Sequence, residues 1–226
     1  MNLPLSILFD LDGTLVDTAP DLAAAMNHVL ALCGRSPLPV DAVRHLVGHG
    51  ARALISRGLA ATGDPAPQLV EQHFPDFLHH YAANIAAASR PFDGVEAALD
   101  ELAAHGCRLS ICTNKPTHLA LALVEALGWQ GRFAAVVGQT SVARPKPDAG
   151  HVHATLAAAG GDAASAAFVG DSATDVGAAR NAGLPIVLVS FGYTDRPAHE
   201  LGGDVVIDHY DALLPALRNF GRSLAG

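Results

Sequence analysis

The stretch Ser6-Ile7-Leu8-Phe9-Asp10-Leu11-Asp12-Gly13-Thr14 places a short, mainly apolar run directly before two acidic residues. The apolar run predicts a buried strand, and Gly13 permits the backbone to turn after it. Because side chains alternate along an extended chain, Asp10 and Asp12 share one face. Two carboxylates so placed can hold a hard cation or divide nucleophilic and acid–base work between them. For this motif taken alone, an acidic turn without chemistry is the alternative.

From Arg90 onward, short apolar segments alternate with helical ones. We expect strands at 108–112, 134–137, 166–169, 186–189 and 204–207, and helices at 94–105, 118–127, 150–159, 174–182 and the C-terminus. Such an alternation predicts an α/β, Rossmann-like core: a parallel sheet covered by helices on both faces. In such folds, the catalytic and ligand-binding residues lie at the carboxyl ends of the strands.

The region between Asp17 and Arg90 has a helical character, and we expect no strand within it. Thr18, followed by Asp21, predicts the N-cap of a helix that runs to about residue 32 and is closed by Gly34. Further helices are expected at 41–47, 51–61 and 68–88. The sequence therefore predicts an α-helical domain at 18–89, inserted into a core made of 1–17 and 90–226.

The composition narrows the class of protein. The chain has 226 residues, 50% of them hydrophobic and 16% charged, with a formal net charge of −8. These values exclude a disordered chain and disfavour binding to nucleic acid or to an anionic membrane. No apolar run approaches membrane-spanning length, and we expect no signal peptide at the N-terminus. The three cysteines have no metal or redox spacing, so we expect reduced thiols in the cytoplasm.

Three further strand ends carry polar residues. Thr113 and Asn114 precede a helix and can hold phosphate oxygens. Lys146 lies between two prolines, which stiffen the loop that presents it. Asp171 ends a strand, and Asp175 is one helical turn further on, so both can face the same point. Each signal taken alone also describes an ordinary turn, loop or helix start.

The chain uses lysine twice, at positions 115 and 146, against twelve arginines. Since arginine serves the ordinary surface roles in this chain, a lysine indicates a position where a compact ammonium group is required. If a phosphate monoester joined Asp10, Asp12, Asp171 and Asp175, the site would carry a charge of about −5 with Asp12 protonated. Mg²⁺ and one ammonium would reduce it to about −2, and the all-oxygen ligands favour Mg²⁺ over zinc. The residues therefore predict phosphoryl chemistry at a divalent metal.

Four motifs in this order resemble those of the haloacid-dehalogenase-like superfamily: Asp10-Leu11-Asp12-Gly13-Thr14-Leu15-Val16-Asp17, Thr113, Lys146 and Gly170-Asp171-Ser172-Ala173-Thr174-Asp175. The resemblance covers nearly the whole chain, and the helical insertion looks like the α-helical cap of that superfamily. The overall length and two segments, Val47-Gly48-His49-Gly50-Ala51 and Thr113-Asn114-Lys115-Pro116-Thr117, are similar to those of bacterial phosphoglycolate phosphatases.

The resemblance implies a mechanism through an aspartyl phosphate. Asp10 would be the nucleophile and Asp12 the general acid and base. The metal would be bound by Asp10, the backbone carbonyl of Asp12 and Asp171, with support from Asp175. Thr113, Asn114 and Lys146 would hold the phosphoryl group.

The implied substrate is a small phosphoester, 2-phosphoglycolate, with Mg²⁺ as the cofactor. In the cap, His49 and Arg52 are the candidates for substrate contact, and Arg57 is a second candidate for binding a carboxylate. We expect neither a nucleic-acid nor a membrane partner, and a monomer or homodimer.

Several alternatives remain open at this point. An amino-sugar or hexose phosphate could replace phosphoglycolate as the substrate, and a mutase similar to beta-phosphoglucomutase shares the same core motifs. A phosphoacceptor signalling domain also combines carboxylates, a threonine and a lysine, but it is about half this length. A haloacid dehalogenase is disfavoured by the presence of Asp12.

Overall fold

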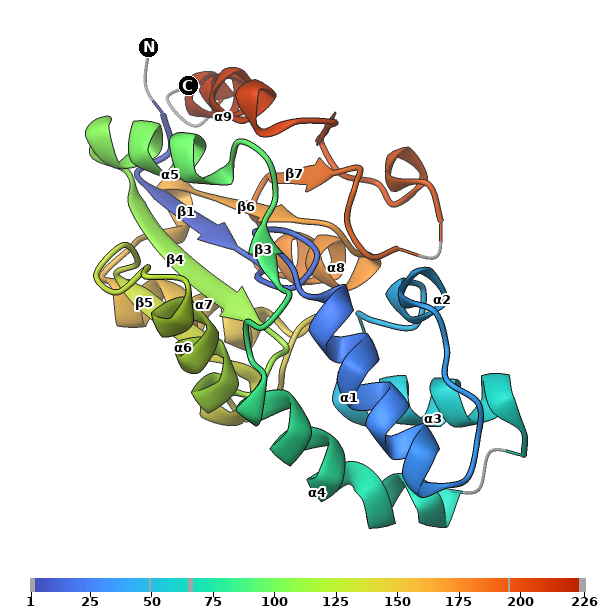
Figure 1. The fold of residues 1–226 in the computed structure, drawn as a ribbon. Coiled ribbons are helices and arrows are strands. Elements are labelled where there is room, and N and C mark those ends of the chain that lie inside the picture. The colour runs from blue at the N-terminus through green and yellow to red at the C-terminus, as the bar shows by residue number, and fades with distance from the viewer. Residues whose placement is uncertain (1–2, 49, 65–66, 195, 224–226) are drawn as a thin grey trace.

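The computed structural model describes residues 3–48, 50–64, 67–194 and 196–223, with side chains described up to residue 220. Six strands form one parallel sheet in the order β5-β4-β1-β6-β7-β8 (Figure 1). Their bounds are β1 Ser6–Phe9, β4 Arg108–Thr113, β5 Ala135–Gly138, β6 Ala166–Gly170, β7 Ile186–Val189 and β8 Val205–Ile207. The strand that carries the first acidic motif is therefore central, with β4 and β6 as its neighbours.

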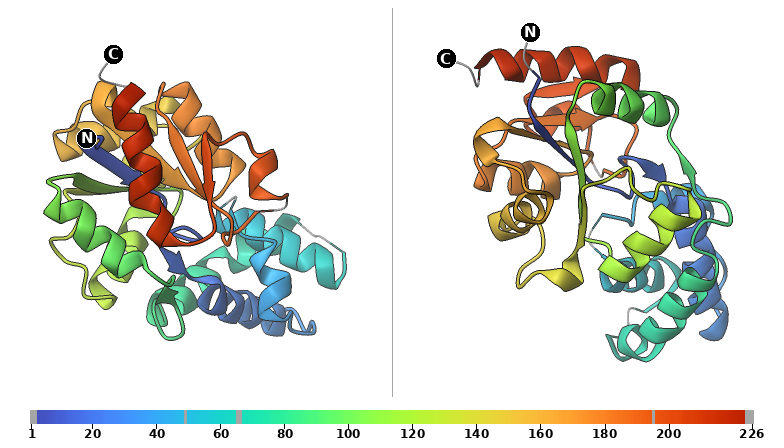
Figure 2. Two further views of the ribbon diagram at one scale, coloured as in Figure 1. Left: turned by 90° about the horizontal axis from the view of Figure 1, so that it is seen from above. Right: turned by 90° about the vertical axis from the view of Figure 1, so that its left-hand side faces the viewer.

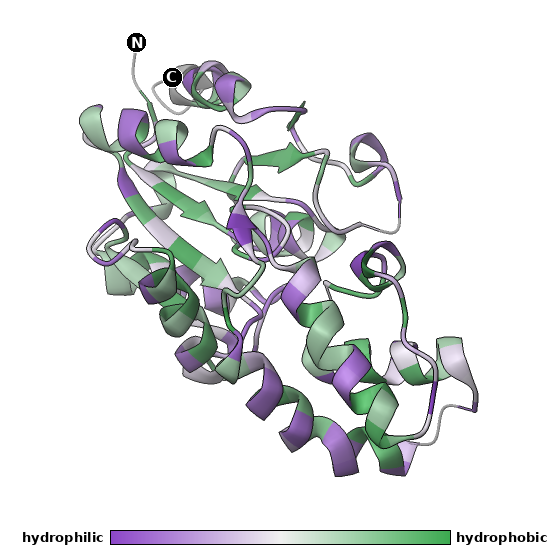
Figure 3. Ribbon diagram, viewed as in Figure 1, coloured by the Kyte–Doolittle hydropathy of each residue, from purple (hydrophilic) through white to green (hydrophobic). Residues whose placement is uncertain are grey.

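Helices cover both faces of this sheet (Figure 2), as the alternation of segments predicts. They are α5 Val95–Ala104, α6 Thr117–Ala126, α7 Ala149–Ala159, α8 Ala173–Asn181 and α9 Leu213–Ser223. Ile7 and Phe9 of β1 pack in the core that includes residues of α5, α6 and α9, whereas Leu8 packs with residues of α7 and α8. The central strands are mostly hydrophobic (Figure 3), since their residues are buried from both faces, whereas β4 begins with the exposed Arg108.

In the described part of the chain, four helices lie between β1 and α5: α1 Ala19–Leu32, α2 Val40–Arg44, α3 Ala51–Thr62 and α4 Pro67–Ala83. They enclose an apolar cluster of their own, which includes Met26, Ile55 and Phe77. The arrows of β1 and β4 point toward this helical layer (Figure 1), so it lies beyond the carboxyl ends of the strands. Within the described residues, no helix combines the length and the apolar character needed to cross a bilayer.

Two very short strands join the two parts. β2 (Val16–Asp17) and β3 (Arg90–Pro91) pair antiparallel where the chain leaves the core and where it returns. Two residues are too few to produce a periodic pattern, so the sequence did not predict this pair.

The start of α1 differs from the expectation. Thr18 stands at the N-cap, but its side chain makes no capping hydrogen bond. The Asp21 carboxylate instead accepts hydrogen bonds from Ala88 N at 2.9 Å, Ser89 N at 2.8 Å and Ser89 Oγ at 2.6 Å. The helix predicted at 68–88 ends earlier, at Ala83, and the turns that follow it lead into this contact.

The end of α1 agrees with the expectation. The predicted stop at Gly34 is present, since Gly34 has a φ of 66° and donates to Ala31 O.

Replacement of Asp21 by alanine tests this contact. Asp21 is 3% exposed, and its loss leaves two backbone amides and one hydroxyl without their acceptor. We expect Asp21→Ala to lower the free energy of unfolding by about 3 kcal/mol in urea titrations. Asp100→Ala is the matched control because this carboxylate is 68% exposed and forms a surface ion pair with Arg132. It should cost about 0.5 kcal/mol or less. Equal losses in the two variants would contradict the assigned role.

Candidate active site

Four separate segments meet at the carboxyl edge of the sheet. Asp10 and Asp12 follow β1, and Thr113 ends the neighbouring strand β4. Asp171 follows β6 on the other side of β1, and Lys146 reaches the same point from the loop before α7. Because the strands are parallel and adjacent, residues more than a hundred positions apart in the chain converge here.

Lys146 is the electrostatic centre of this site. Its Nζ lies 3.0 Å from Asp10 Oδ1 and 2.6 Å from Asp175 Oδ1, and the residue is 3% exposed. Burial alone would lower the pKa of Lys146, but the two carboxylates raise it above its ordinary value. For Asp10 the balance is reversed: burial raises its pKa to about 6, although Lys146 acts in the opposite direction. One ammonium thus compensates only part of the negative charge.

The backbone of Lys146 is fixed from both sides. Lys146 N donates to Asn114 Oδ1 at 3.0 Å, and Asn114 Nδ2 donates to Lys146 O at 3.0 Å. Lys146 N also approaches His151 Nδ1 at 3.2 Å, while His151 Nε2 contacts Val137 O at 3.0 Å. Burial lowers the pKa of His151 to about 4, so its ring is neutral near pH 7 and can accept at Nδ1. The direction of the ammonium is therefore set by hydrogen bonds to its own peptide groups.

Asp171 and Asp175 are held by different partners. Asp171 accepts from Thr14 Oγ1 at 2.8 Å and from Tyr193 N at 2.6 Å, and burial raises its pKa well above the ordinary value. Asp175 uses one oxygen for Lys146 and the other in a capping box with Ser172 at the start of α8. Both oxygens of Asp175 are thus engaged within the protein.

The carboxylates of Asp10, Asp171 and Asp175 form a cluster that could hold a cation. Each offers one ligand atom within 4.8 Å of the others. All donors are oxygen atoms, which suit a hard divalent ion such as Mg²⁺. The raised pKa values of Asp10 and Asp171 reflect buried negative charge that the described cations do not fully compensate. The residues present therefore fit a divalent cation.

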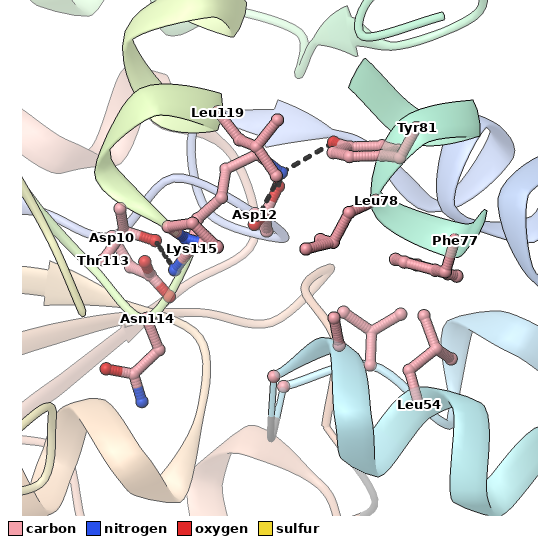
Figure 4. Close-up of a pocket in the computed structure, with 15 residues that line it drawn as sticks. Asp10, Asp12, Leu54, Phe77, Leu78, Tyr81, Thr113, Asn114, Lys115 and Leu119 are labelled. Atoms are coloured by element: carbon pink, nitrogen blue, oxygen red, sulfur yellow. Dashed lines mark hydrogen bonds and ion pairs between the residues drawn. The ribbon is translucent and has the colours of Figure 1, made fainter. Parts of the chain in front are cut away.

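A second ammonium contacts Asp12. Lys115 Nζ donates to both Asp12 carboxylate oxygens, at 2.9 and 3.1 Å, and to the hydroxyl of Tyr81 on α4 at 2.6 Å (Figure 4). The same Nζ lies 4.4 Å from the centre of the Tyr81 ring. Sequence reasoning did not place Lys115 in the site, although the scarcity of lysine was the signal. Thr14, Tyr81 and Tyr193 carried no comparable signal.

These groups border a pocket between the sheet edge and the helices α3 and α4 (Figure 4). Polar groups of the core line one side, and mostly apolar residues of the helical layer line the other. The lining residues are Asp10, Asp12, Val47, Gly48, Gly50, Ala51, Leu54, Phe77, Leu78, Tyr81, Thr113, Asn114, Lys115, Pro116 and Leu119.

The structure brings together most of the residues singled out in the sequence: Asp10, Asp12, Thr113, Asn114, Lys146, Asp171 and Asp175. It does not bring Arg52 to them. Arg52 Nε lies 2.9 Å from Glu71 Oε1, and its guanidinium carbon lies 3.7 Å from the centre of the Phe74 ring. Both contacts hold Arg52 on an exposed part of the helical layer. His49 lies outside the described residues.

The arrangement matches a known family over most of its length. A family model described as haloacid dehalogenase-like hydrolase matches residues 7–189. The chain belongs to this family. The match confirms the resemblance and the fold class expected from the motifs, and it rules out the signalling domain as the class of this protein.

Relatives of this haloacid dehalogenase-like hydrolase include named enzymes. The phosphoglycolate phosphatase of Caulobacter vibrioides is 50% identical over 210 residues, covering 91% of this chain and 87% of the relative. That of Agrobacterium fabrum is 46% identical over 215 residues, covering 95% and 92%. A crystal structure of a predicted phosphoglycolate phosphatase from Haemophilus somnus superposes with a TM-score of 0.88 at 28% identity, covering 96% of this chain and 99% of the other. CbbY from Rhodobacter sphaeroides in complex with phosphate gives 0.79 at 25% identity, covering 96% and 100%.

Removal of the Lys146 ammonium tests the charge balance. In Lys146→Met, Asp10 and Asp175 remain buried without their cation, so we expect a loss of about 3–5 kcal/mol in the free energy of unfolding at pH 7.5 without divalent ions. The loss should be smaller at pH 5. The pKa of Asp10 is about 6 beside Lys146, and without Lys146 it rises further above its value in the unfolded chain. As the pH falls, the folded variant therefore takes up a proton on Asp10 before the unfolded chain does, and part of the lost stability is regained.

Urea titrations of the variant and the wild type at both pH values measure this difference. A loss that is the same at pH 5 and pH 7.5 would contradict the assigned electrostatic role of Lys146.

Proposed function

We propose that this chain is a Mg²⁺-dependent phosphatase that hydrolyses 2-phosphoglycolate to glycolate and phosphate. The observation that carries the proposal is the position of Asp10: it borders the pocket, contacts Lys146 and belongs to the acidic cluster. The names of the relatives that are 50% and 46% identical support the substrate. Three free thiols, Cys33, Cys107 and Cys112, support a location in the reducing cytoplasm.

Asp10 is the proposed nucleophile. Its Oδ1 accepts from Leu11 N at 2.7 Å and contacts Lys146, so we assign the attack on phosphorus to Oδ2. A bond forms between Oδ2 and phosphorus while the bond from phosphorus to the ester oxygen breaks. The product of this step is an aspartyl phosphate and a leaving alkoxide.

Asp12 is the proposed proton carrier. It lies two residues from Asp10, borders the same pocket and donates a proton to the leaving alkoxide. In the second step, Asp12 accepts a proton from a water molecule whose oxygen attacks phosphorus. The bond between phosphorus and Asp10 breaks, which releases phosphate and regenerates ionised Asp10 and protonated Asp12.

Asp10, Asp171 and the backbone carbonyl of Asp12 would hold Mg²⁺, with Asp175 supporting the site. A bound Mg²⁺ would neutralise negative charge between these carboxylates and the phosphoryl group. Since both oxygens of Asp175 already have protein partners, we assign it the task of positioning Lys146 and the start of α8.

The phosphoryl oxygens would be bound by Thr113, the backbone amide of Asn114 and Lys146. Thr113 Oγ1 accepts from Lys115 N at 3.2 Å, so its own proton can be donated to a phosphoryl oxygen. The Asn114 side chain is committed to the Lys146 peptide groups, which leaves only its backbone amide for this task.

The helical region 18–89 is proposed as a cap that excludes water from the reaction. Its residues Leu54, Phe77 and Leu78 line the pocket opposite Asp10, so an apolar wall faces the organic part of the substrate. Such a wall and the small number of polar groups favour a compact substrate over a sugar phosphate with many hydroxyls. We propose that the chain works as a monomer or homodimer.

A phosphate-release screen over small phosphoesters tests the substrate. The value of kcat/KM should be highest for 2-phosphoglycolate, by about tenfold or more over hexose and amino-sugar phosphates. Preference for a bulky sugar phosphate would refute the substrate.

Replacement of Asp10 tests the nucleophile. Asp10→Asn should lower turnover by about 10³-fold or more while the circular dichroism spectrum and Tm stay close to wild type. Turnover of Asp10→Asn within tenfold of wild type would refute the nucleophile.

Removal of the metal tests the cation site. Activity should vanish in EDTA and return with Mg²⁺, and Mg²⁺ should raise the Tm of the wild type because it binds the folded state. Asp171→Asn retains the shape of the side chain but loses its charge, so the rise in Tm should largely disappear. A full rise in Tm in Asp171→Asn, or full activity in chelator, would contradict the assignment.

A further inference from the structure

The glycolate part of the proposed substrate carries a carboxylate, and this group needs a cation that the mechanism above does not supply. A single methylene separates this carboxylate from the ester oxygen. Asp12 is the residue that protonates the ester oxygen in the proposed mechanism. A group that binds the substrate carboxylate must therefore lie beside Asp12. Without a cation, a second negative charge in a pocket that already contains Asp10 and Asp12 would be strongly disfavoured.

Lys115 meets this condition. Its Nζ lies 2.9 and 3.1 Å from the oxygens of Asp12, and among the described residues that line the pocket it is the one cation. The residue is 6% exposed, so its charge acts in a largely dehydrated setting where pairing matters most.

The other cations near the site have different partners. Lys146 lies between Asp10 and Asp175 and is not among the lining residues. Arg52 pairs with Glu71 away from the pocket. Arg57 lines a separate cavity, together with Ser172 and Tyr193, and donates to a backbone carbonyl at 3.4 Å.

Tyr81 completes the arrangement from the helical layer. Its hydroxyl accepts from Lys115 at 2.6 Å and retains its own proton, which it can donate to a ligand oxygen. Burial raises the pKa of Tyr81 well above its ordinary value, so the hydroxyl stays protonated over the working range of pH. An ammonium and a hydroxyl, one from each part of the molecule, therefore lie side by side in the pocket.

We propose that Lys115, held by Tyr81, binds the carboxylate of the substrate and selects small phosphomonoesters that carry this second negative group. The inference rests on the proposed function and assigns its specificity. Before substrate binds, Asp12 and Tyr81 hold the ammonium in place. When substrate binds, the carboxylate shares the ammonium with Asp12, which lies beside the ester oxygen.

The test compares two substrates that differ in this group. In 2-hydroxyethyl phosphate, a hydroxymethyl group replaces the carboxylate of 2-phosphoglycolate. The wild type should prefer 2-phosphoglycolate in kcat/KM, and Lys115→Met should reduce this ratio by about tenfold or more, mainly through KM. Lys115→Arg keeps the charge and should keep most of the ratio. Tyr81→Phe keeps the ring and should reduce the ratio by a smaller factor. Thermal unfolding of each variant confirms that it is folded.

The outcomes separate this inference from the proposed function. If the wild type prefers 2-phosphoglycolate but Lys115→Met keeps the same ratio, or slows both substrates equally, the inference is overturned and the function stands. If Arg52→Met loses the ratio and Lys115→Met keeps it, the carboxylate is bound by Arg52. If the wild type hydrolyses neither substrate but acts on another phosphoester, the proposed function itself fails. If Lys115→Met does not fold, a loss of the ratio in folded Lys115→Arg, with the charge kept, overturns the inference, whereas retention of the ratio supports it.

Discussion

The rest of the site depends on the ion pairs of buried Lys146 with Asp10 and Asp175. They connect the tip of β1, a loop that follows β5 and the first turn of α8. A buried carboxylate without a cation would be costly, and one ammonium serves two of them. The remaining negative charge is tolerated through hydrogen bonds, such as those of Thr14 and Tyr193 to Asp171. The carboxylates are thus held by contacts within the protein, and their excess of negative charge favours a cation.

The central position of β1 in the sheet explains how a few residues at the strand ends suffice to build the site. β4 and β6 flank β1, so the residues that follow these three strands become neighbours without any long loop. The core supplies the carboxylates and ammonium groups, and the helices α3 and α4 supply the apolar side of the pocket. The core and the helical layer make a direct polar contact beside Asp12, through the hydrogen bond from Lys115 to Tyr81. The charged groups and the apolar wall of the pocket therefore come from different parts of the chain.

Much of the fold was predictable because its signals are local. Continuous apolar runs indicated the six core strands, and the acidic residues after β1 and β6 indicated a site at the sheet edge. Contacts between distant residues carry no such signal. The Asn114 side chain holds a peptide group 32 residues away, and Asp21 holds one 67 residues away. Nor does the sequence reveal that Arg52 turns toward Glu71, because this depends on how α3 packs beside α4.

The central place of β1 also has a consequence for biosynthesis. When the ribosome has made the first ninety residues, β1 exists without β4 and β6, and the hydrophobic side chains of its residues Ile7 and Leu8 have no sheet to enter. β4 can pair with β1 once residue 113 has left the exit tunnel, but the edge of β1 that receives β6 stays open until residue 170 has followed, and an open edge of this kind favours aggregation. The last hydrogen bond to Asp171 comes from Tyr193, so the appearance of enzymatic activity during translation would report that almost the entire polypeptide has been synthesised and folded.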